Sequence, residues 1–337
     1  MTHNKKLTST QIAKLAGVAR STVSKVINNY PDIPEATKQK VMAVIEQHNY
    51  KPNVFSSALK GIPQKIITLY LHTTANDSLT SSMGNLDSSY VMSVMTNFIY
   101  CASQQGYLLQ VEVINESDCQ ESVLKRIKAT FNERLICAAV FLGLTDNATF
   151  IDRLAEQGYK VFSIDRIIDD SLDGFNVTTD DFNGSYEATR LFLDRGLTEI
   201  SFIGGDFTKL SARQREAGYR AALKEANITP DVIPCGYSEL LARSIAEDLL
   251  KRGAKPEAIV CASDIIAYGI IKVCGREFLE NVKLIGFDDL PFNEYQQPPL
   301  SSVAVDFHQM AEDTIKAIID GCESKRIIAK TQLRNRL

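Results

Sequence analysis

The chain has 337 residues, of which 45% are hydrophobic and 23% are charged, and its formal net charge is −4. This length and composition are typical of a globular protein of two or three domains and exclude a membrane-spanning chain, because no apolar run reaches about 20 residues. The seven cysteines are scattered without a CxxC pair, which argues against a disulfide framework and against a zinc site. We expect no cofactor. With a polar N-terminus lacking a signal-peptide core, we expect a cytoplasmic protein.

Charge divides the chain into a basic head and an acidic body. Residues 1–61 hold nine Lys and Arg against three Asp and Glu, so they carry +6 and residues 62–337 carry −10. This asymmetry indicates a polyanionic partner for the head alone.

Residues 7–28 read as two short helices joined by a tight turn at Gly17. Each helix has one apolar stripe, Ile12 to Ala16 in the first and Val23 to Ile27 in the second, and Thr8 or Ser9 can cap the first helix. The opposite face of the second helix carries cations, hydroxyls and an amide but no carboxylate: Arg20, Ser21, Ser24, Lys25 and Asn28. These groups suit base edges and phosphates, although an ordinary helical hairpin with a solvated face would read similarly.

A third helix is expected from Pro34 to about His48, which completes a small bundle. The following segment, residues 50–61, can form a two-turn helix capped by Asn53 and ended by Gly61. Such a short helix is marginal in water, so it folds against DNA and a partner copy or else is a plain linker.

From Ile66 onward the pattern changes to apolar strands that alternate with amphipathic helices, which predicts parallel sheets covered on both faces. The strands are expected at 66–72, 108–113, 138–142, 160–164, 174–178, 200–204, 258–261, 284–287 and 302–306. The helices are expected at 89–105, 117–131, 147–157, 181–195, 212–226, 238–252, 264–278 and 308–319. Because this is too many strands for one compact sheet, two α/β lobes are predicted.

Polar residues at the strand ends predict a ligand site in the cleft between the lobes. They are Asp165-Arg166, the helix start from Ser211 to Arg215, Ser263-Asp264 and Asp288-Asp289. Carboxylates paired with an Arg suit a polyhydroxylated ligand, because each can bond two adjacent hydroxyls. We expect Asp264, and also Asp289, to cap helices instead.

These residues together resemble the LacI/GalR family of bacterial transcription repressors along essentially the whole chain. The resemblance lies in AGVARSTVSKVIN, in NYKPN followed by SSALKG, and in SARQREAGYRAAL, ASDIIAYG, LIGFDD and PPLSSV in the family's order. It implies an α/β protein with an N-terminal three-helix helix-turn-helix headpiece and a two-lobed body of the periplasmic-binding-protein type, with Rossmann-like parallel sheets. The implied domains are the headpiece at 1–50, a hinge helix and linker at 51–63, and an effector-binding and dimerisation domain at 64–337. Its first lobe would span about 64–176 plus 305–337, and its second about 177–304.

The resemblance also assigns roles to residues. Arg20, Ser21 and Lys25 match major-groove readers, and Leu59 matches a hinge leucine that wedges into the minor groove. The remaining DNA-binding positions are Thr10, Ser24, Asn28, Thr37, Tyr50, Asn53 and Ser56. In the body, Arg215 and Asp288 match the best-supported effector contacts, and Asp165, Tyr237 and Ser263 match positions that often line the pocket. Ser263 departs from the family pattern, which usually has Asn there.

The resulting hypothesis is a homodimeric, cytoplasmic repressor that joins the nucleoid when bound to a pseudo-palindromic operator of double-stranded DNA. Its effector is expected to be a sugar or sugar derivative acting as an inducer; a corepressor such as a purine or another metabolite is the alternative. A Rossmann-type enzyme is disfavoured because GGDFTK lacks the G-x-G-x-x-G spacing, so no catalytic residues are expected. A transport protein is disfavoured by the basic head and the absent signal peptide.

Overall fold

The computed structural model describes residues 7–27, 30, 32–48, 50, 64–73, 88–252 and 256–337. The chain divides into two compact units, Met1–Gln64 and Lys65–Leu337. The predicted hinge helix and linker, residues 51–63, lie outside the described residues.

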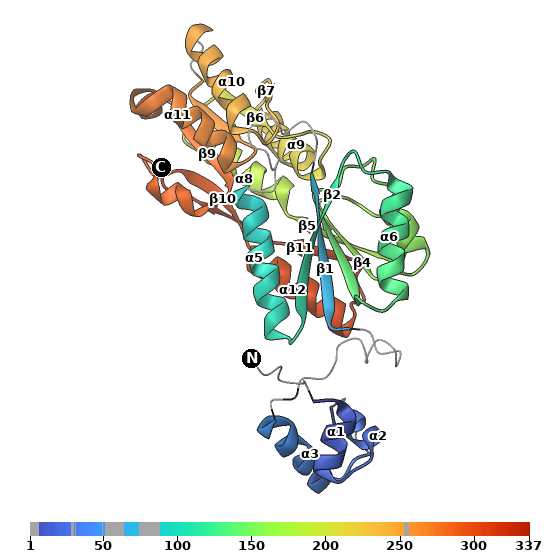
Figure 1. Cartoon of the computed structure of the whole chain (residues 1–337). Coiled ribbons are helices and arrows are strands. Elements are labelled where there is room, and N and C mark those ends of the chain that lie inside the picture. The colour runs from blue at the N-terminus through green and yellow to red at the C-terminus, as the bar shows by residue number, and fades with distance from the viewer. Residues whose placement is uncertain are drawn as a thin grey trace, which may run out of the picture. The chain divides into compact units, whose positions relative to one another are not determined.

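The N-terminal unit contains the three predicted helices, α1 (Ser9–Ala16), α2 (Arg20–Ile27) and α3 (Glu35–Gln47) (Figure 1). The two apolar stripes meet in one small core, in which Ile12, Ala16, Val23 and Val41 are fully buried. Thr8 caps α1 in a capping box with Gln11, which satisfies unpaired N–H groups at the helix start. Gly17 ends α1 with a φ of 60°, the left-handed conformation that glycine adopts without strain.

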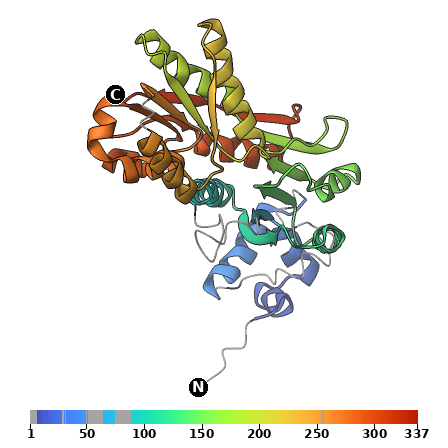
Figure 2. The same cartoon turned by 90° about the horizontal axis from the view of Figure 1, so that it is seen from above.

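The first sheet of the larger unit is entirely parallel, with the strand order β11-β5-β4-β3-β1-β2. Its strands are β1 (Ile66–Thr73), β2 (Leu108–Asn115), β3 (Ala138–Leu142), β4 (Val161–Ile164), β5 (Gly174–Thr179) and β11 (Arg326–Ala329). On one side of the sheet lie α5 (Ser89–Gln104) and α12 (Phe307–Asp320), and on the other α6 (Gln120–Asn132) and α7 (Phe150–Glu156). Figures 1 and 2 show α5 and α6 on opposite sides of the sheet.

The second sheet has the order β12-β10-β9-β8-β6-β7 and is parallel except for β12, which runs antiparallel to β10. Its strands are β6 (Ile200–Gly204), β7 (Asp231–Pro234), β8 (Ala258–Cys261), β9 (Lys283–Asp288), β10 (Ser301–Val305) and β12 (Thr331–Arg334). The helices α8 (Asp181–Asp194) and α9 (Leu210–Glu225) pack on each other, as do α10 (Glu239–Arg252) and α11 (Asp264–Asn281). A short 3-10 helix, η3 (Pro291–Tyr295), connects β9 to β10.

The chain passes between the lobes three times: after β5, after β10 and between β11 and β12. The third crossing departs from the expectation that all of 305–337 belongs to the first lobe. Residues 331–334 pair with β10, because only Lys330 separates β11 from β12 and the chain passes directly from one sheet to the other.

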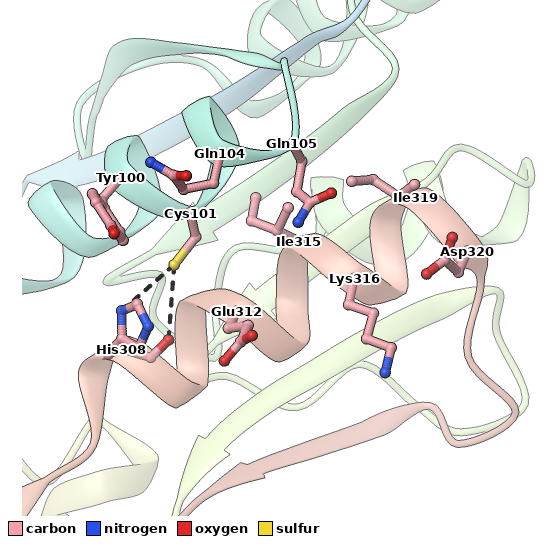
Figure 3. Close-up of a pocket in the computed structure, with 10 residues that line it drawn as sticks. All are labelled: Tyr100, Cys101, Gln104, Gln105, His308, Glu312, Ile315, Lys316, Ile319 and Asp320. Atoms are coloured by element: carbon pink, nitrogen blue, oxygen red, sulfur yellow. Dashed lines mark hydrogen bonds between the residues drawn. The ribbon is translucent and has the colours of Figure 1, made fainter.

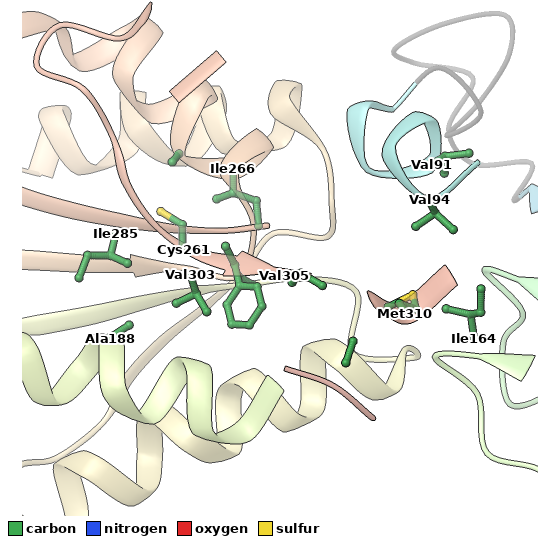
Figure 4. Packing of buried hydrophobic residues seen from close by; sticks show 14 of the residues in the cluster. Val91, Val94, Ile164, Ala188, Cys261, Ile266, Ile285, Val303, Val305 and Met310 are labelled. Carbon is green, nitrogen blue, oxygen red and sulfur yellow. The ribbon is translucent and has the colours of Figure 1, made fainter. Parts of the chain in front are cut away.

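The hydrophobic core is continuous from one lobe to the other. Val94 of α5, Ile164 of β4 and Met310 of α12 belong to the same buried cluster as Val303 and Ile285 of the second sheet. Figure 4 shows Val303 and Ile285 on one side of this cluster and Met310 and Ile164 on the other. The strand ends at the lobe junction therefore rest on packed side chains, which fix the positions of the polar groups described next.

Candidate ligand site and nucleic-acid interface

The outer face of α2 presents the polar groups predicted from its sequence. Arg20 and Ser21 are exposed and Ser24 and Lys25 half-buried, while Val23 and Val26 of the same helix point into the core. Thr10 is also exposed and Thr37 half-buried, whereas Asn28 lies outside the described residues. Arg20, Ser21, Ser24 and Lys25 thus share the helix side opposite the core stripe, as a base-reading helix requires.

Two of the predicted readers make contacts within the headpiece. Lys25 Nζ donates to Asp32 Oδ2 at 2.6 Å, and Arg20 Nε donates to Ser9 Oγ at 3.2 Å. The hydrogen bond from Lys25 lowers the pKa of Asp32. The predicted base reader Lys25 is therefore paired with a carboxylate of its own headpiece.

The remaining predicted DNA contacts divide into one described residue and three outside the described part of the chain. Tyr50 is half-buried and packs against the headpiece core, so its ring helps to close the three-helix bundle. Asn53, Ser56 and Leu59 lie outside the described residues.

In the larger unit, Arg215 is the centre of a buried ionic network. Its Nε donates to Asp181 Oδ1 at 2.7 Å and its Nη1 to the Ala262 carbonyl at 2.5 Å, and its Nη2 lies 3.4 Å from Asp288 Oδ1. The guanidinium carbon lies 3.6 Å from the ring centre of Phe287, a cation–π distance. The Arg215, Asp181 and Asp288 side chains are each at most 5% exposed. This arrangement holds the guanidinium in one orientation.

Asp165 joins the two lobes at the end of β4. Its carboxylate accepts from the backbone N–H and from the hydroxyl of Ser211, both at 2.7 Å, and Ser211 lies in the first turn of α9 in the second lobe. The Tyr237 hydroxyl lies 3.0 Å from Ser211 Oγ. A Cβ on Gly205 would lie 2.4 Å from the Tyr237 ring, so the absence of a side chain there gives the ring its place. Two predicted effector residues, Asp165 and Tyr237, thus meet through Ser211.

Further contacts bridge the lobes beside this pair. Arg213 Nη2 lies 3.1 Å from Asp146 Oδ2, and Lys209 Nζ donates to the Gly143 carbonyl. Lys209 precedes α9 and Arg213 lies in its first turn, whereas Asp146 and Gly143 follow β3. The lobes are therefore closed onto each other at the strand ends.

Three of the strand-end aspartates, Asp165, Asp288 and Asp289, hold an uncommon backbone conformation with a positive φ. The φ of Asp165 is 65° and that of Asp288 is 102°, in the left-handed region where a Cβ is strained. Such strain concentrates at ligand sites, where it aims a side chain that an ordinary strand residue would not aim.

Burial and charge perturb the titration of these groups. Burial, assisted by the charge of Asp181, raises the pKa of Asp165 to about 6. Burial likewise raises the pKa of Asp288 to about 8, against the opposing effect of Arg215. Burial acts to lower the pKa of Arg215, but the carboxylates of Asp181 and Asp288 outweigh it and raise that pKa. The site thus places three carboxyl groups around one guanidinium, and burial disfavours the ionised forms of Asp165 and Asp288.

A helix cap was predicted for Asp264, and the neighbouring Ser263 provides it instead. Ser263 Oγ, rather than Asp264, caps α11 by accepting from the Ile266 N–H. Asp264 Oδ2 accepts from the Leu290 N–H and from Asn293 Nδ2, and Oδ1 accepts from the Ser302 hydroxyl. The prediction that Asp264 caps a helix is wrong, because its side chain turns away from α11 and fastens the loop after β9.

Asp289 does not cap a helix either. Its Oδ1 lies 2.8 Å from Arg336 Nη1 and also accepts from Asn293 Nδ2. This ion pair ties the C-terminal residues to the loop that follows β9.

Asp181 and Tyr90 are members of the network that the sequence analysis missed. Asp181 opens α8 directly after the crossing from the first lobe and also accepts from the Thr179 hydroxyl. Burial, together with the charges of Asp165 and Asp288, raises the pKa of Tyr90 on α5, and the Tyr90 ring packs edge-on against Phe307 with 5.6 Å between the ring centres. Asp181 could have been predicted from the sequence, because Asp180-Asp181 stands between a strand and a helix like the other strand-end carboxylates. No pattern in the sequence points to Tyr90.

A separate cavity of about 410 Å³ lies between α5 and α12, away from these aspartates. Its lining combines polar and apolar side chains, including Gln104, Lys316 and Ile315 (Figure 3). Cys101 Sγ lies 3.7 Å from His308 Nδ1 at one end of it. None of the sequence-predicted effector residues lines this cavity.

Across the described ranges, no group of three or more His, Cys, Asp and Glu side chains is arranged to hold a metal ion. Within the same ranges, no helix is both long and apolar enough to cross a membrane.

Comparison with known proteins assigns each unit separately. The model for bacterial regulatory proteins of the lacI family matches residues 10–53, and the model for periplasmic-binding-protein-like domains matches residues 189–336. The HTH-type transcriptional repressor PurR of Vibrio vulnificus (strain CMCP6) is 26% identical over 324 residues, covering 93% of this chain and 91% of PurR. The HTH-type transcriptional regulator MalR of Clostridium butyricum is 27% identical over 358 residues, covering 96% and 97%.

Solved structures show the same fold at low sequence identity. The lac repressor dimer bound to operator and the anti-inducer ONPF superposes with a TM-score of 0.79 at 19% identity, covering 98% of each chain. A complex of the transcriptional regulator CelR with cellobiose gives 0.68 at 22% identity, again covering 98% of each chain.

Proposed function

The chain belongs to the lacI family of bacterial regulatory proteins, and from this premise we propose that a sugar or sugar derivative controls its affinity for operator DNA. Members of this family are repressors with an effector-binding domain and not enzymes. The observation that carries the proposal is the buried network at the lobe junction, where Arg215 and strand-end carboxylates converge. Carboxylates and a guanidinium can each bond two neighbouring hydroxyls of a sugar ring in fixed geometry.

In this proposal the functional residues are those predicted from the sequence, with Asp181 and Ser211 added. The headpiece at 1–50 contacts DNA and the hinge at 51–63 follows it. The effector domain at 64–337 binds the ligand through Asp165, Arg215, Tyr237, Ser263 and Asp288.

The proposed mechanism uses the contact that joins the lobes. A ligand between the lobes replaces the bond from Ser211 to Asp165 with bonds of its own, and the two lobes then take a different relative position. If the ligand binds this second arrangement more tightly, the population shifts toward it and the affinity for DNA changes. By thermodynamic linkage, bound DNA changes the affinity for the ligand by the same factor as the ligand changes the affinity for DNA. Release of DNA makes the ligand an inducer.

A homodimer is part of the proposal, because a pseudo-palindromic operator needs two headpieces. Its support is the run of exposed apolar side chains on α5, where Met92, Ile99 and Tyr100 are 44%, 45% and 55% exposed. A second copy would cover them.

A purine corepressor is the second candidate, and the similarity to PurR proteins supports it. The two candidates predict opposite signs: a sugar inducer lowers operator affinity, whereas a corepressor raises it.

A thermal-shift screen of the purified chain against sugars, sugar acids and purines tests the proposal. A ligand that binds only the folded state stabilises it by about 2.7 kcal/mol at roughly 100 times its dissociation constant. A sugar hit that weakens operator binding supports the proposal. A purine hit that strengthens operator binding replaces it with the alternative.

A further inference from the structure

We propose that the inter-lobe site selects a polyhydroxylated ligand bearing an amino group, of the amino-sugar class, over acidic ligands such as sugar phosphates, and that Asp181 is a determinant of this selection. The inference rests on the proposed function of the site as the effector site. It adds the charge of the ligand, which neither the fold nor the family relationship supplies.

The first argument is the balance of charge. Asp165, Asp181 and Asp288 lie around one guanidinium, Arg215, which contacts Asp181 and Asp288 directly. The other cations near the lobe junction have acceptors elsewhere: Lys209 donates to the Gly143 carbonyl, Arg213 pairs with Asp146, and Arg166 pairs with Asp152 at 2.5 Å. Because the pKa of Asp288 is raised to about 8, that group is largely protonated at neutral pH, but the carboxylates of Asp165 and Asp181 still outnumber the one guanidinium. An ammonium group on the ligand offsets this excess of negative charge.

The second argument is a buried acceptor without a hydrogen-bond donor. Asp288 is 5% exposed, and its Oδ1 accepts no hydrogen bond from any described residue; Arg215 Nη2 lies 3.4 Å away. The strained φ of 102° holds this carboxylate where the strand ends at the lobe junction. A hydrogen-bond donor on the ligand would stabilise a buried acceptor in this state, and a charged donor would stabilise it most. A phosphate or carboxylate at the same place would instead bring a like charge beside it.

A ligand bound beside Arg215 and Asp288 of the second lobe would also meet acidic groups of the first lobe. Asp165 comes from the end of β4 in the first lobe, and its carboxylate accepts hydrogen bonds from Ser211 of the second lobe. The raised pKa values of Asp165 and Asp288 have the same origin, since burial and neighbouring carboxylates disfavour their ionised forms. A cation between the lobes would restore both carboxylates to the ionised form.

Asp181 is the residue whose charge can be removed with the least change in shape. Its Oδ1 accepts from Arg215 Nε, and in Asp181→Asn the amide oxygen can accept the same hydrogen bond in the same place. The substitution removes the negative charge of Asp181 while the guanidinium keeps an acceptor. Asp146→Asn is the matched control, because Asp146 also pairs with an arginine but sits at the exposed rim.

The experiment measures affinities of the whole chain by calorimetry for three matched panels: hexosamines, the parent hexoses and the hexose 6-phosphates. We expect one hexosamine to bind at least about tenfold more tightly than its hexose, and the phosphates to bind more weakly still. Asp181→Asn should reduce the ratio of hexosamine to hexose affinity about tenfold, whereas Asp146→Asn should leave it unchanged. Circular dichroism verifies folding, and Asp165→Asn provides a second variant with the same expected direction if Asp181→Asn unfolds.

Three results would overturn the inference: no hexosamine binds, a phosphate or neutral sugar binds best, or the affinity ratio is the same in Asp181→Asn and Asp165→Asn as in the unaltered chain. A neutral sugar that binds and changes operator affinity would overturn the charge selection and leave the proposed function standing. Loss of operator binding or of every sugar response would instead contradict the proposed function itself.

Discussion

Arg215 is expected to stabilise the body, in addition to the ligand contact proposed for it. Its donors are taken up by Asp181 and the Ala262 carbonyl, and its guanidinium lies against the Phe287 ring. Removing one partner from a buried ionic network leaves the others uncompensated, at a cost of about 3–5 kcal/mol. Arg215→Ala should therefore lower the free energy of unfolding by about that amount, measured by urea denaturation.

Arg215→Lys is the matched variant, because it keeps the charge and loses the planar fork. We expect it to lose less stability than Arg215→Ala. A change below about 1 kcal/mol in Arg215→Ala would show that the network does not stabilise the ligand-free body.

Lys25, a predicted base reader, has an ion-pair partner inside the headpiece. Asp32 Oδ2 accepts from Lys25 Nζ at 2.6 Å, and both side chains are about half exposed, at 44% and 54%. Asp32→Asn should raise DNA affinity several-fold, since it removes both the competing acceptor and a negative charge near the phosphates. Fluorescence anisotropy with a labelled duplex at low salt measures the effect.

Glu35→Gln is the control for general charge, because Glu35 pairs with Lys38 at 3.8 Å and not with a predicted base reader. If both variants gain affinity equally, net charge explains the gain and the contact from Asp32 to Lys25 does not.

At the scale of single residues, the sequence predicted which side chains lie at strand ends but not what each one bonds. Asp165, Arg215 and Asp288 follow apolar strands or open a helix, and these patterns are readable. That Ser263 caps α11 while Asp264 fastens Leu290 and its loop depends on side-chain directions set by packing. No local pattern encodes those directions.

At the scale of elements, α8 and α9 pack closely because Gly218 has no side chain. A Cβ at Gly218 would lie 2.1 Å from the Phe182 carbonyl oxygen, a backbone atom that cannot move without moving α8. Replacing a helical Gly with Ala ordinarily stabilises a protein by about 1 kcal/mol. Gly218→Ala should do the opposite and destabilise by about 1–3 kcal/mol in urea denaturation. A stabilised variant would contradict this packing.

The regular elements were readable from periodicity, and the exceptions have a common cause. The strands 138–142, 200–204 and 258–261 coincide with β3, β6 and β8, because they are buried on both faces and read as continuous apolar runs. β7, β11 and β12 were not predicted. They are four-residue strands at sheet edges, with exposed residues that dilute the apolar pattern.

For the whole molecule, the buried aspartates predict how stability depends on pH. Burial raises the pKa of Asp264 to about 7 and that of Asp288 to about 8, so between about pH 4 and these values the folded state holds protons that the unfolded state lacks. Stability from such groups decreases as pH rises, by about 1.4 kcal/mol per unit for each group. His72 acts in the opposite direction below about pH 6.5, because burial lowers its pKa.

The free energy of unfolding should therefore decrease between about pH 6.5 and 8, measured by urea denaturation at several pH values. Asp264→Asn removes one titrating group, so the decrease should become smaller in this variant even if its overall stability is lower. A free energy that stays constant or rises over this range would contradict the prediction.

The arrangement of lobes was predictable from the number of strands, and the closed state of the lobes was not. Nothing in the pattern of residues 62–337 indicates that Asp165 bonds Ser211 across the junction. Closure depends on the relative positions of two separately folded sheets, which follow from three chain crossings and a shared core.

The most direct test begins by selecting, from a random library, the DNA duplexes that the whole chain binds. The affinity for the best duplex is then measured over a range of salt concentrations, with and without the effector. The account predicts a preferred pseudo-palindromic sequence, an affinity that falls steeply with salt as counterions are released, and a further change when the effector is added. Equal binding to all duplexes, or no binding at low salt, would contradict it.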